Sequence, residues 1–509
     1  MAQLPQFPVS YWTAEADIPT FPKLERDRQT DVVVVGAGLT GITTAYLLAK
    51  AGMKVIVLEA GRVLHGTTGH TTAKITAQHD VIYDELINHF GEYSARLYYE
   101  ANRDALQFIR STADEEKVDC RLATEDAYLY AETEQSAAKL DKEYRAYGQL
   151  GIPSQLTDSI TLPFQIKSAL AMKDQARFDP IPYLMALIKR ITALGGELFE
   201  HTTAMRVDEG AEPVVVTEND RRITCKYVVS ASHYPFLDWK GFYFARMHAE
   251  RSYVLAVRVP GPYPGGMYLS VDQPTHSIRL AEEGDQPLLL IGGEGHKAGQ
   301  SPCTIRHYEA LQTFAESKFS ATEIAYRWSA QDLVTLDKLP YIGPITAGTD
   351  NVLIATGYRK WGMTNATAAA QILADRVLGQ VNRYKELFDP SRFHADPDIK
   401  SFVKDNADVA KELISGKLEL TYRSPDELKA GEGGVVRVNG KRAGAYRDPD
   451  GDLHLVDTTC THLGCETHWN DGDQTWDCPC HGSRYSYKGE VVEGPAKEPL
   501  ARIGMAEKS

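Results

Sequence analysis

Two short boxes of cysteine and histidine near the C-terminus constrain this chain most strongly. One reads C-T-H-L-G-C, from Cys460 to Cys465, and the other reads C-P-C-H-G-S, from Cys478 to Ser483. Together they offer thiolates and imidazoles in the combination that suits a [2Fe–2S] centre with two cysteines on one iron and two histidines on the other. A tetrahedral zinc site uses the same residue types and is the alternative interpretation.

A glycine motif typical of dinucleotide binding lies at the other end of the chain. Gly36, Gly38 and Gly41 form G-x-G-x-x-G between a β-branched run and a predicted helix over 40–51. The glycines permit a tight turn, the approach of a pyrophosphate to the backbone and close packing of helix on strand. The next predicted strand ends at Glu59, whose carboxylate can bind ribose hydroxyls. A nucleotide-binding βαβ unit is therefore predicted.

Composition sets outer limits on the kind of protein. The chain has 509 residues, enough for two or three domains, and its net charge of −14 disfavours binding to nucleic acid or to an anionic membrane surface. No apolar run approaches about 18 residues, so no integral membrane segment is expected. The start of the chain lacks the pattern of a signal peptide, and Cys120, Cys225 and Cys303 are isolated. A cytoplasmic location is expected.

Changes of pattern along the chain predict three parts. Up to residue 385, helical and strand-like segments alternate, with helices expected over 83–110 and 365–377. Residues 386–420 are charged and weakly periodic, which indicates a connector. Over residues 421–509, short strand-like runs alternate with the turn pairs N-G and D-G, a pattern typical of an all-β domain.

The first part resembles the D-amino-acid oxidase/glycine oxidase family of FAD-dependent oxidoreductases, over roughly residues 28–380. The similarity rests on the βαβ unit, on R-F-D-P from Arg177, on the strand V-V-S-A-S near Ser230, on L-P-Y-I-G-P from Leu339 and on A-T-G-Y-R-K-W-G-M-T. The resemblance implies FAD as cofactor. It also implies an α/β fold with a Rossmann-type FAD-binding domain and an antiparallel-sheet substrate domain, interleaved within residues 1–385.

The same resemblance implies which residues contact FAD. The segment after Glu59 would wrap the cofactor, and a closing helix would point its positive N-terminus at the flavin ring, where it stabilises the charge of reduced flavin. The residues carried over are Thr67, Thr68, Gly69 and His70, and near the isoalloxazine Gly357, Trp361, Gly362, Met363 and Thr364. The run G-T-T-G-H is also similar to a motif of dimethylglycine-dehydrogenase-like flavoproteins, in which the histidine bonds covalently to flavin. His70 is thus either a covalent attachment point or a non-covalent neighbour of the cofactor.

The substrate pocket is less well marked in the sequence. Where the family has N-A-A-G, this chain reads S-A-S-H from Ser230 to His233. Arg279 is a candidate partner for a substrate carboxylate, and His296 is a second pocket candidate. For both, an ordinary ion pair or polar contact is the alternative.

The last part, over about residues 420–505, resembles Rieske proteins. The resemblance implies that Cys460 and Cys478 bind one iron and that His462 and His481 bind the other. It further implies a disulfide between Cys465 and Cys480, hydroxyl hydrogen bonds from Ser483 and Tyr485 to cluster or cysteine sulfur, and a covering proline loop at Gly494-Pro495-Ala496. In such domains the histidines sit at an exposed tip.

Three functional hypotheses follow from a flavin and a cluster on one chain. In the first, an amino acid or amine is oxidised by FAD, and electrons pass through the cluster to an unidentified redox partner. In the second, an external donor reduces the cluster, which reduces the flavin for a reductive reaction. In the third, the protein is a redox sensor and not an enzyme. The connector is long enough for a fixed or a mobile C-terminal domain.

Overall fold

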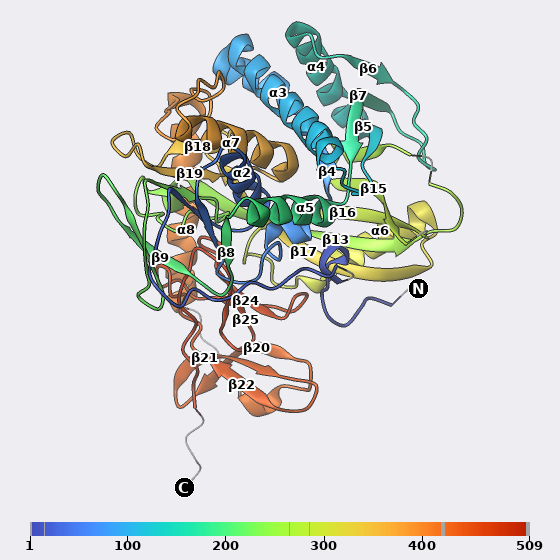
Figure 1. Ribbon diagram of the computed structural model, residues 1–509. Coiled ribbons are helices and arrows are strands. Elements are labelled where there is room, and N and C mark those ends of the chain that lie inside the picture. Colours follow the sequence, from blue (N-terminus) through green and yellow to red (C-terminus); the bar gives the residue numbers. More distant parts are fainter. Residues whose placement is uncertain (1–2, 15, 264, 285, 419–422, 505–509) are drawn as a thin grey trace.

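The computed structural model describes residues 3–14, 16–263, 265–284, 286–418 and 423–504. A large body, from α1 (Tyr11–Ala14) to α7 (Gly362–Val377), sits above a smaller C-terminal unit, from η3 (Pro425–Glu427) to β26 (Val491–Glu493) (Figure 1). The large body combines α/β layers with mixed sheets, and the C-terminal unit is built of antiparallel strands. The predicted fold class is confirmed.

A largely parallel sheet forms the first layer of the large body, with strand order β18-β19-β12-β2-β3-β8. Its strands are Tyr341–Pro344 (β18), Val352–Thr356 (β19), Tyr227–Ser230 (β12), Val32–Val35 (β2), Val55–Leu58 (β3) and Glu197–Phe199 (β8). β18 runs antiparallel to its neighbour, and the other pairs are parallel. All residues of β2 and β3 are buried, as expected for a parallel sheet covered on both faces.

Helices cover this sheet. α2 (Leu39–Lys50) packs between α7 and α5 (Pro180–Ala193), and the long α3 (Tyr83–Glu115) packs on α7. The helix predicted over 83–110 therefore extends five residues further, and its backbone is interrupted at Gly91, which has φ +79°. The closing helix begins at Gly362, three residues before its predicted start.

A second, mixed sheet lies beside the first, with strand order β17-β13-β16-β15-β14-β5-β7-β4 and with β6 paired to β7. Its strands are Glu323–Thr335 (β17), Met247–Arg258 (β13), Gln286–Lys297 (β16), His276–Glu283 (β15), Met267–Ser270 (β14), Ala123–Ala131 (β5), Ser168–Arg177 (β7), Lys74–Ile75 (β4) and Ser154–Thr157 (β6). Its helices are α4 (Glu134–Leu150), which packs on β5 to β7, and α6 (Ile305–Phe319), which packs on β13 and β16. A smaller sheet joins β1 (Arg28–Gln29), β11 (Arg222–Thr224), β10 (Val214–Thr217) and β9 (Ala204–Asp208).

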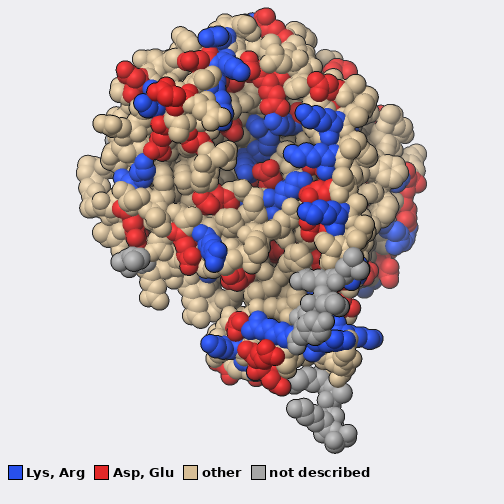
Figure 2. All heavy atoms as spheres, turned by 180° about the vertical axis from the view of Figure 1, so that it is seen from behind, with Lys and Arg blue, Asp and Glu red and all other residues tan. Residues whose placement is uncertain are grey.

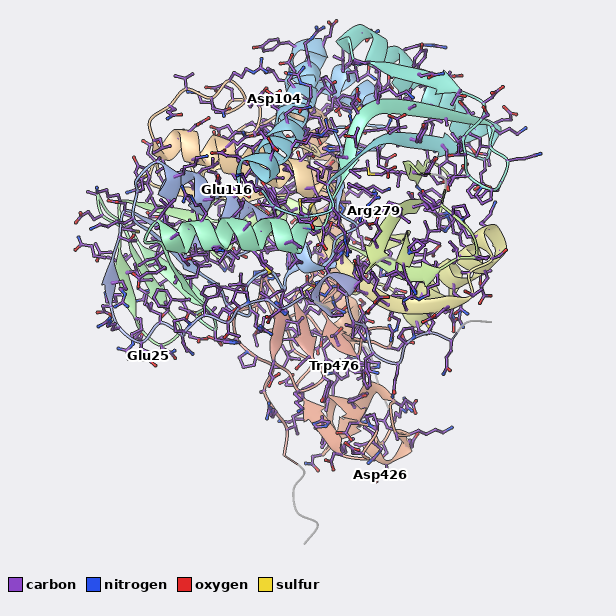
Figure 3. The ribbon with its side chains drawn as sticks, turned by 45° about the vertical axis from the view of Figure 1, so that its right-hand side comes forward. Glu25, Asp104, Glu116, Arg279, Asp426 and Trp476 are labelled. Atoms are coloured by element: carbon purple, nitrogen blue, oxygen red, sulfur yellow. A yellow bond between two sulfur atoms is a disulfide. The ribbon has the colours of Figure 1, made fainter. Side chains whose placement is uncertain are left out.

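The C-terminal unit has two antiparallel sheets. One contains β20 (Gly433–Val438), β21 (Lys441–Arg447) and β22 (Leu453–Val456), and the other contains β23 (His468–Asn470), β24 (Thr475–Asp477), β25 (Arg484–Ser486) and β26. Trp476 of β24 links the two sheets, because its ring packs directly against Gly444 of β21. A Cβ on Gly444 would stand only 2.6 Å from Cζ2 of that ring. Figure 3 shows Trp476 in the part of this unit that adjoins the large body.

The connector is mainly one helix, α8 (Ala395–Leu418), and it is tied to the large body by charge. Lys297 Nζ lies 3.1 Å from Asp405 and 2.9 Å from Asp408, and His248 Nδ1 lies 3.0 Å from Asp405. In the structure these pairs hold the connector against the large body. The predicted boundary between residues 420 and 421 lies outside the described residues, and the three-part division stays a prediction.

A buried network of charges locks the C-terminal unit onto the second sheet. Arg251 of β13 has 1% of its side chain exposed, donates to Glu493 of β26 at 3.2 Å and lies 3.5 Å from Asp477 of β24. Arg484 of β25 pairs with Asp473 and lies 3.3 Å from Asp477. Burial alone would raise the pKa of Asp473, yet the two arginines lower it to about 2. These charges therefore stay ionised and paired across the interface.

The length and composition of the helices show whether any of them could cross a membrane. Among the described residues, no helix combines the length and the apolar character that a membrane crossing requires.

One stability prediction concerns the start of α3. The buried Glu143 of α4 accepts from the backbone N–H groups of Ile82, Tyr83 and Asp84 at 3.1, 2.8 and 3.1 Å. Glu143→Ala leaves these donors without their acceptor, so we expect the free energy of unfolding to fall by about 1–3 kcal/mol. Denaturant unfolding followed by circular dichroism measures it. Glu134→Ala, on the exposed side of the same helix, is the control, and an equal loss in both variants would contradict this assignment.

A second prediction concerns the buried network. Arg484→Met removes the cation that pairs with Asp473 and Asp477, and breaking a buried pair costs about 3–5 kcal/mol. We expect the C-terminal unit to unfold earlier than in the wild type, measured by calorimetry together with limited proteolysis. The control is Arg502→Met in the same unit, because the Arg502–Glu490 pair is 68% and 65% exposed and is worth about 0–1 kcal/mol. Equal stability of the two variants would argue against the lock.

Candidate cofactor sites

A cavity of about 950 Å³ lies where the two large sheets meet the C-terminal unit. The glycine turn and Glu59 line one part, strands of the second sheet line another, and residues 491–497 of the C-terminal unit close it. Figure 2 shows a hollow on one face of the molecule, with lysine and arginine side chains gathered around it and carboxylates between them. The cavity thus brings together segments from both ends of the chain.

The glycine turn has the geometry of a phosphate cradle. Gly36 has φ +105°, and a Cβ there would stand 2.5 Å from the Ala231 carbonyl oxygen. A Cβ on Gly41 would stand 1.9 Å from the carbonyl oxygen of Gly36. α2 begins directly after Gly38, and no side chain of the N-cap residue caps it. The positive end of this helix, beside the tight glycine turn, fits a pyrophosphate.

Glu59 is oriented by the turn itself. Its Oε2 accepts from the N–H of Ala37 at 2.9 Å, and its Oε1 accepts from the N–H of Gly61 at 2.9 Å. Burial raises the pKa of this carboxyl group. Since it lines the cavity with acceptor capacity to spare, it fits a ribose hydroxyl pair.

The segment predicted to wrap the cofactor forms η1 (Thr67–His70). Thr67, Thr68 and His70 line the cavity, and Thr68 Oγ1 accepts from the first amide of α2 at 3.0 Å. Gly69 does not line it, and a Cβ there would stand 2.6 Å from the Leu64 carbonyl oxygen. His70 Nδ1 lies 2.9 Å from the carbonyl oxygen of Gly66.

The predicted closing segment, which leads into α7, places the N-terminus of that helix at the cavity. Trp361, Gly362 and Met363 line it, and α7 starts there without a capping side chain. Gly357 and Thr364 stand behind this wall. A Cβ on Gly357 would stand 2.3 Å from Thr335 Cγ2, and Thr364 Oγ1 donates to the Thr76 carbonyl oxygen at 3.1 Å.

A histidine that the sequence did not single out lies behind this wall. His79 is fully buried, stacks on Trp361 with ring centroids 4.8 Å apart and lies 3.0 Å from Thr364 Oγ1. Burial lowers the pKa of His79 to about 3, which keeps the ring neutral. The only sequence signal for His79 was its place in the short polar run T-A-Q-H. Sequence spacing could not show that His79 contacts Trp361 and Thr364, which lie far along the chain.

The two pocket candidates lie elsewhere. Neither Arg279 nor His296 is among the described residues that line the cavity. Arg279 is buried in the interior of the large body, where Nη1 donates to the Ala73 carbonyl oxygen at 2.7 Å (Figure 3). His296 Nε2 lies 2.9 Å from Tyr253 Oη, and its ring stacks on His307. Both side chains therefore make ordinary polar contacts within the protein, which is the alternative that the sequence left open. Arg279 lies on β15 and His296 on β16, so the second sheet sets their positions.

The cysteine–histidine boxes converge on one buried site. Cys460 and Cys478 are 2% and 1% exposed, and a hydrogen bond with the Cys478 thiol lowers the pKa of Cys460. The rings of His462 and His481 are nearly perpendicular, with centroids 5.1 Å apart. The Nδ1 atoms of both histidines are buried and, within the described part of the chain, have no hydrogen-bond partner. A [2Fe–2S] cluster with mixed ligands fits this set of groups: the Cys460 thiol, which favours the thiolate, the buried Cys478 sulfur beside it and two unpartnered imidazole nitrogens.

The surroundings of these boxes also fit. Cys465 and Cys480 are joined by a disulfide that connects the two boxes. Tyr485 Oη lies 3.2 Å from Cys460 Sγ, and Ser483 Oγ accepts from the Ala496 N–H at 3.0 Å, which anchors the proline loop. A hydroxyl beside a ligand sulfur stabilises the reduced cluster.

One expectation for this site is wrong: the histidines are not at an exposed tip. The side chain of His462 is 6% exposed, and His481 is 4% exposed. The segment after β12 covers them, with Asp238 on His462 Nε2 at 2.7 Å and the ring of Phe244 5.9 Å from that of His481. Asp238 and Phe244 carry no motif, so the sequence held no signal for them.

Comparison with known proteins agrees with this geometry. The family described as FAD dependent oxidoreductase (DAO) matches residues 31–376, and the Rieske [2Fe-2S] domain matches residues 420–504. A putative Rieske 2Fe-2S iron-sulfur protein, YhfW of Bacillus subtilis, is 50% identical over 498 residues, which cover 98% of each chain. Gamma-glutamylputrescine oxidoreductase of Escherichia coli is 23% identical, covering 74% of this chain and 90% of that protein.

Among solved structures, glycine oxidase from Geobacillus kaustophilus superposes with a TM-score of 0.61 at 19% identity, covering 72% of this chain and 99% of that one. At this identity the likeness concerns the fold of the large body. The family matches, together with the two buried sites, fix the cofactors as FAD and a Rieske [2Fe–2S] cluster. The chain belongs to the DAO family of FAD-dependent oxidoreductases and carries a Rieske domain at its C-terminal end.

Proposed function

We propose that this protein oxidises an amino acid or amine at FAD and passes the electrons through the Rieske cluster to an external acceptor. The observation that carries the proposal is the shared cavity: residues 491–497 of the Rieske domain form part of the same wall as the glycine turn and α7. When bound, FAD takes a hydride from a substrate C–H bond, and the cluster carries electrons one at a time.

The charges that line the cavity suit a substrate with an amine. Glu250 and Asp332 supply carboxylates, and a hydrogen bond with His248, then the Lys360 charge, lowers the pKa of Glu250 despite its burial. An ionised carboxylate in a confined site attracts an ammonium group. Arg359 lines the cavity as well and can pair with a substrate carboxylate.

Lys74 is our candidate for moving the substrate's proton. It lines the cavity, and its Nζ donates to the Tyr268 carbonyl oxygen at 2.6 Å. Burial, followed by the nearby charge of Arg279, lowers the pKa of Lys74 to about 7. Above that pH its amine is neutral and can accept a proton from a substrate ammonium, which leaves the amine ready for oxidation.

The names of related proteins support this substrate class. The E. coli relative is an oxidoreductase of gamma-glutamylputrescine, an amine, and the structural neighbour is an oxidase of glycine. We also propose a cytoplasmic location, because Cys120 and Cys225 are free thiols, as is usual in a reducing compartment.

An anaerobic titration tests the direction of electron flow. The purified holoprotein is mixed with amino acids, N-methylated amino acids and polyamines, and optical and EPR spectra are recorded. We expect one compound to bleach the flavin and then to produce a Rieske-type EPR signal. The Cys478→Ser variant, which loses a cluster ligand, should still bleach without that signal. If dithionite reduces both cofactors and no amine reduces either, the proposal fails and flow from an external donor takes its place.

A pH profile tests Lys74. With the substrate found above, kcat/KM should rise with pH through about 7, because the neutral amine is the active form and is populated only above its pKa. Lys74→Met should lower kcat/KM about 100-fold or more and remove this rise. Lys338→Met, which changes another cavity lysine whose partner is Glu85 at 2.6 Å, should keep it. A rise near pH 7 that persists in Lys74→Met would exclude Lys74 as the base.

A further inference from the structure

The segment between β12 and β13 stands between the two cofactor sites. Ala231, Ser232, His233, Tyr234 and Phe236 line the cavity of the large body. The same segment also covers the cluster histidines: the Tyr234 ring lies 6.3 Å from that of His462, and the Phe244 ring lies 5.9 Å from that of His481. This segment therefore contacts both cofactor sites, as does the proline loop of the Rieske domain.

Asp238 makes the direct contact with a cluster ligand. Its side chain is 6% exposed, and its Oδ2 lies 2.7 Å from His462 Nε2. Nδ1 of His462 has no partner in the described residues and is the nitrogen free for iron, so Nε2 carries the proton and donates it to the carboxylate. A carboxylate that accepts from the second nitrogen of a ligating histidine fixes the ring and makes it a stronger donor to the metal.

The buried surroundings of Asp238 screen its charge only weakly from the cluster. The carboxylate and both imidazoles are buried, so their Coulomb interaction is stronger than it would be at a wetted tip. A negative charge favours the oxidised cluster, which carries one more positive charge than the reduced cluster. Lys497, directly after the proline loop, is a cation that interacts with Asp238, and its Nζ donates to the Met205 carbonyl oxygen at 2.8 Å.

We propose that Asp238 is a positioning residue for electron exchange: its carboxylate holds the His462 imidazole against the FAD domain and lowers the reduction potential of the cluster. The contact thereby keeps the histidine side of the cluster facing the flavin, and the charge sets how readily the cluster accepts an electron. The inference depends on the cluster and on this contact, and it does not depend on the substrate proposed above.

The test is the cluster's reduction potential, measured by EPR-monitored redox titration of the full-length holoprotein. Asp238→Asn keeps a side-chain oxygen for His462 and removes the charge. We expect the one-electron equilibrium to shift about tenfold toward the reduced cluster, which is a rise of about 59 mV. Asp238→Glu keeps the charge and should stay within about twofold of the wild type, by the same relation.

Glu209→Gln is the matched control. It removes a carboxylate near the same segment, but Glu209 pairs with Lys240 and both are more than a third exposed. We expect no change of potential. An unchanged potential in Asp238→Asn, or an equal shift in Glu209→Gln or in Asp238→Glu, would overturn the proposal.

Iron content is measured first. Loss of the cluster from Asp238→Asn alone, with Asp238→Glu retaining it, would support the role of the charged contact in holding His462. Loss from both would show that the site requires only the packing of the native side chain, and the proposal would fall. Since dithionite supplies the electrons, failure of the amine-oxidation proposal would leave this result unchanged.

Discussion

The buried charges between β13 and the C-terminal unit are the interaction on which the rest of the structure depends. Arg251 and Arg484 face Asp473, Asp477 and Glu493 with side chains that are between 1% and 20% exposed. Buried charges are costly unless each has a partner. In this interface each buried charge has a partner of opposite sign, so the pairs offset the cost of removing these charges from water and hold the Rieske domain against β13.

These buried ion pairs determine how the two cofactor sites are placed for electron exchange. Because the C-terminal unit is held by the network and the connector helix is held by Lys297 and His248, the histidine edge of the cluster stays against the segment after β12. No swing of the Rieske domain is needed to bring it there. In the described structure this segment covers both imidazoles.

How much the sequence could predict depends on whether a residue acts locally. The glycines of the turn, Glu59 and the cysteine–histidine boxes are recognisable because each role is set by neighbours within a few positions. The disulfide between Cys465 and Cys480 likewise joins the two boxes that the Rieske resemblance paired. Asp238 and Arg251 depend on partners 224 and 242 residues away in the chain. The surroundings of Arg279 could not be predicted for the same reason: in sequence it is a strand arginine, and only the fold shows that it donates to backbone carbonyls of distant segments.

The connector illustrates how such distant contacts reach the chemistry. Asp405 of α8 binds His248, His248 lies 3.5 Å from Glu250, and Glu250 pairs with Lys360 at 2.9 Å. Burial alone would lower the pKa of His248, but Asp405 and then Glu250 raise it, and the His248 contact in turn lowers the pKa of Glu250. A helix that joins two domains therefore also sets the charge of a carboxylate in the cavity wall. The connector helix thus influences the cavity through pairs between α8 and the large body, separately from the Arg251 and Arg484 pairs that hold the C-terminal unit.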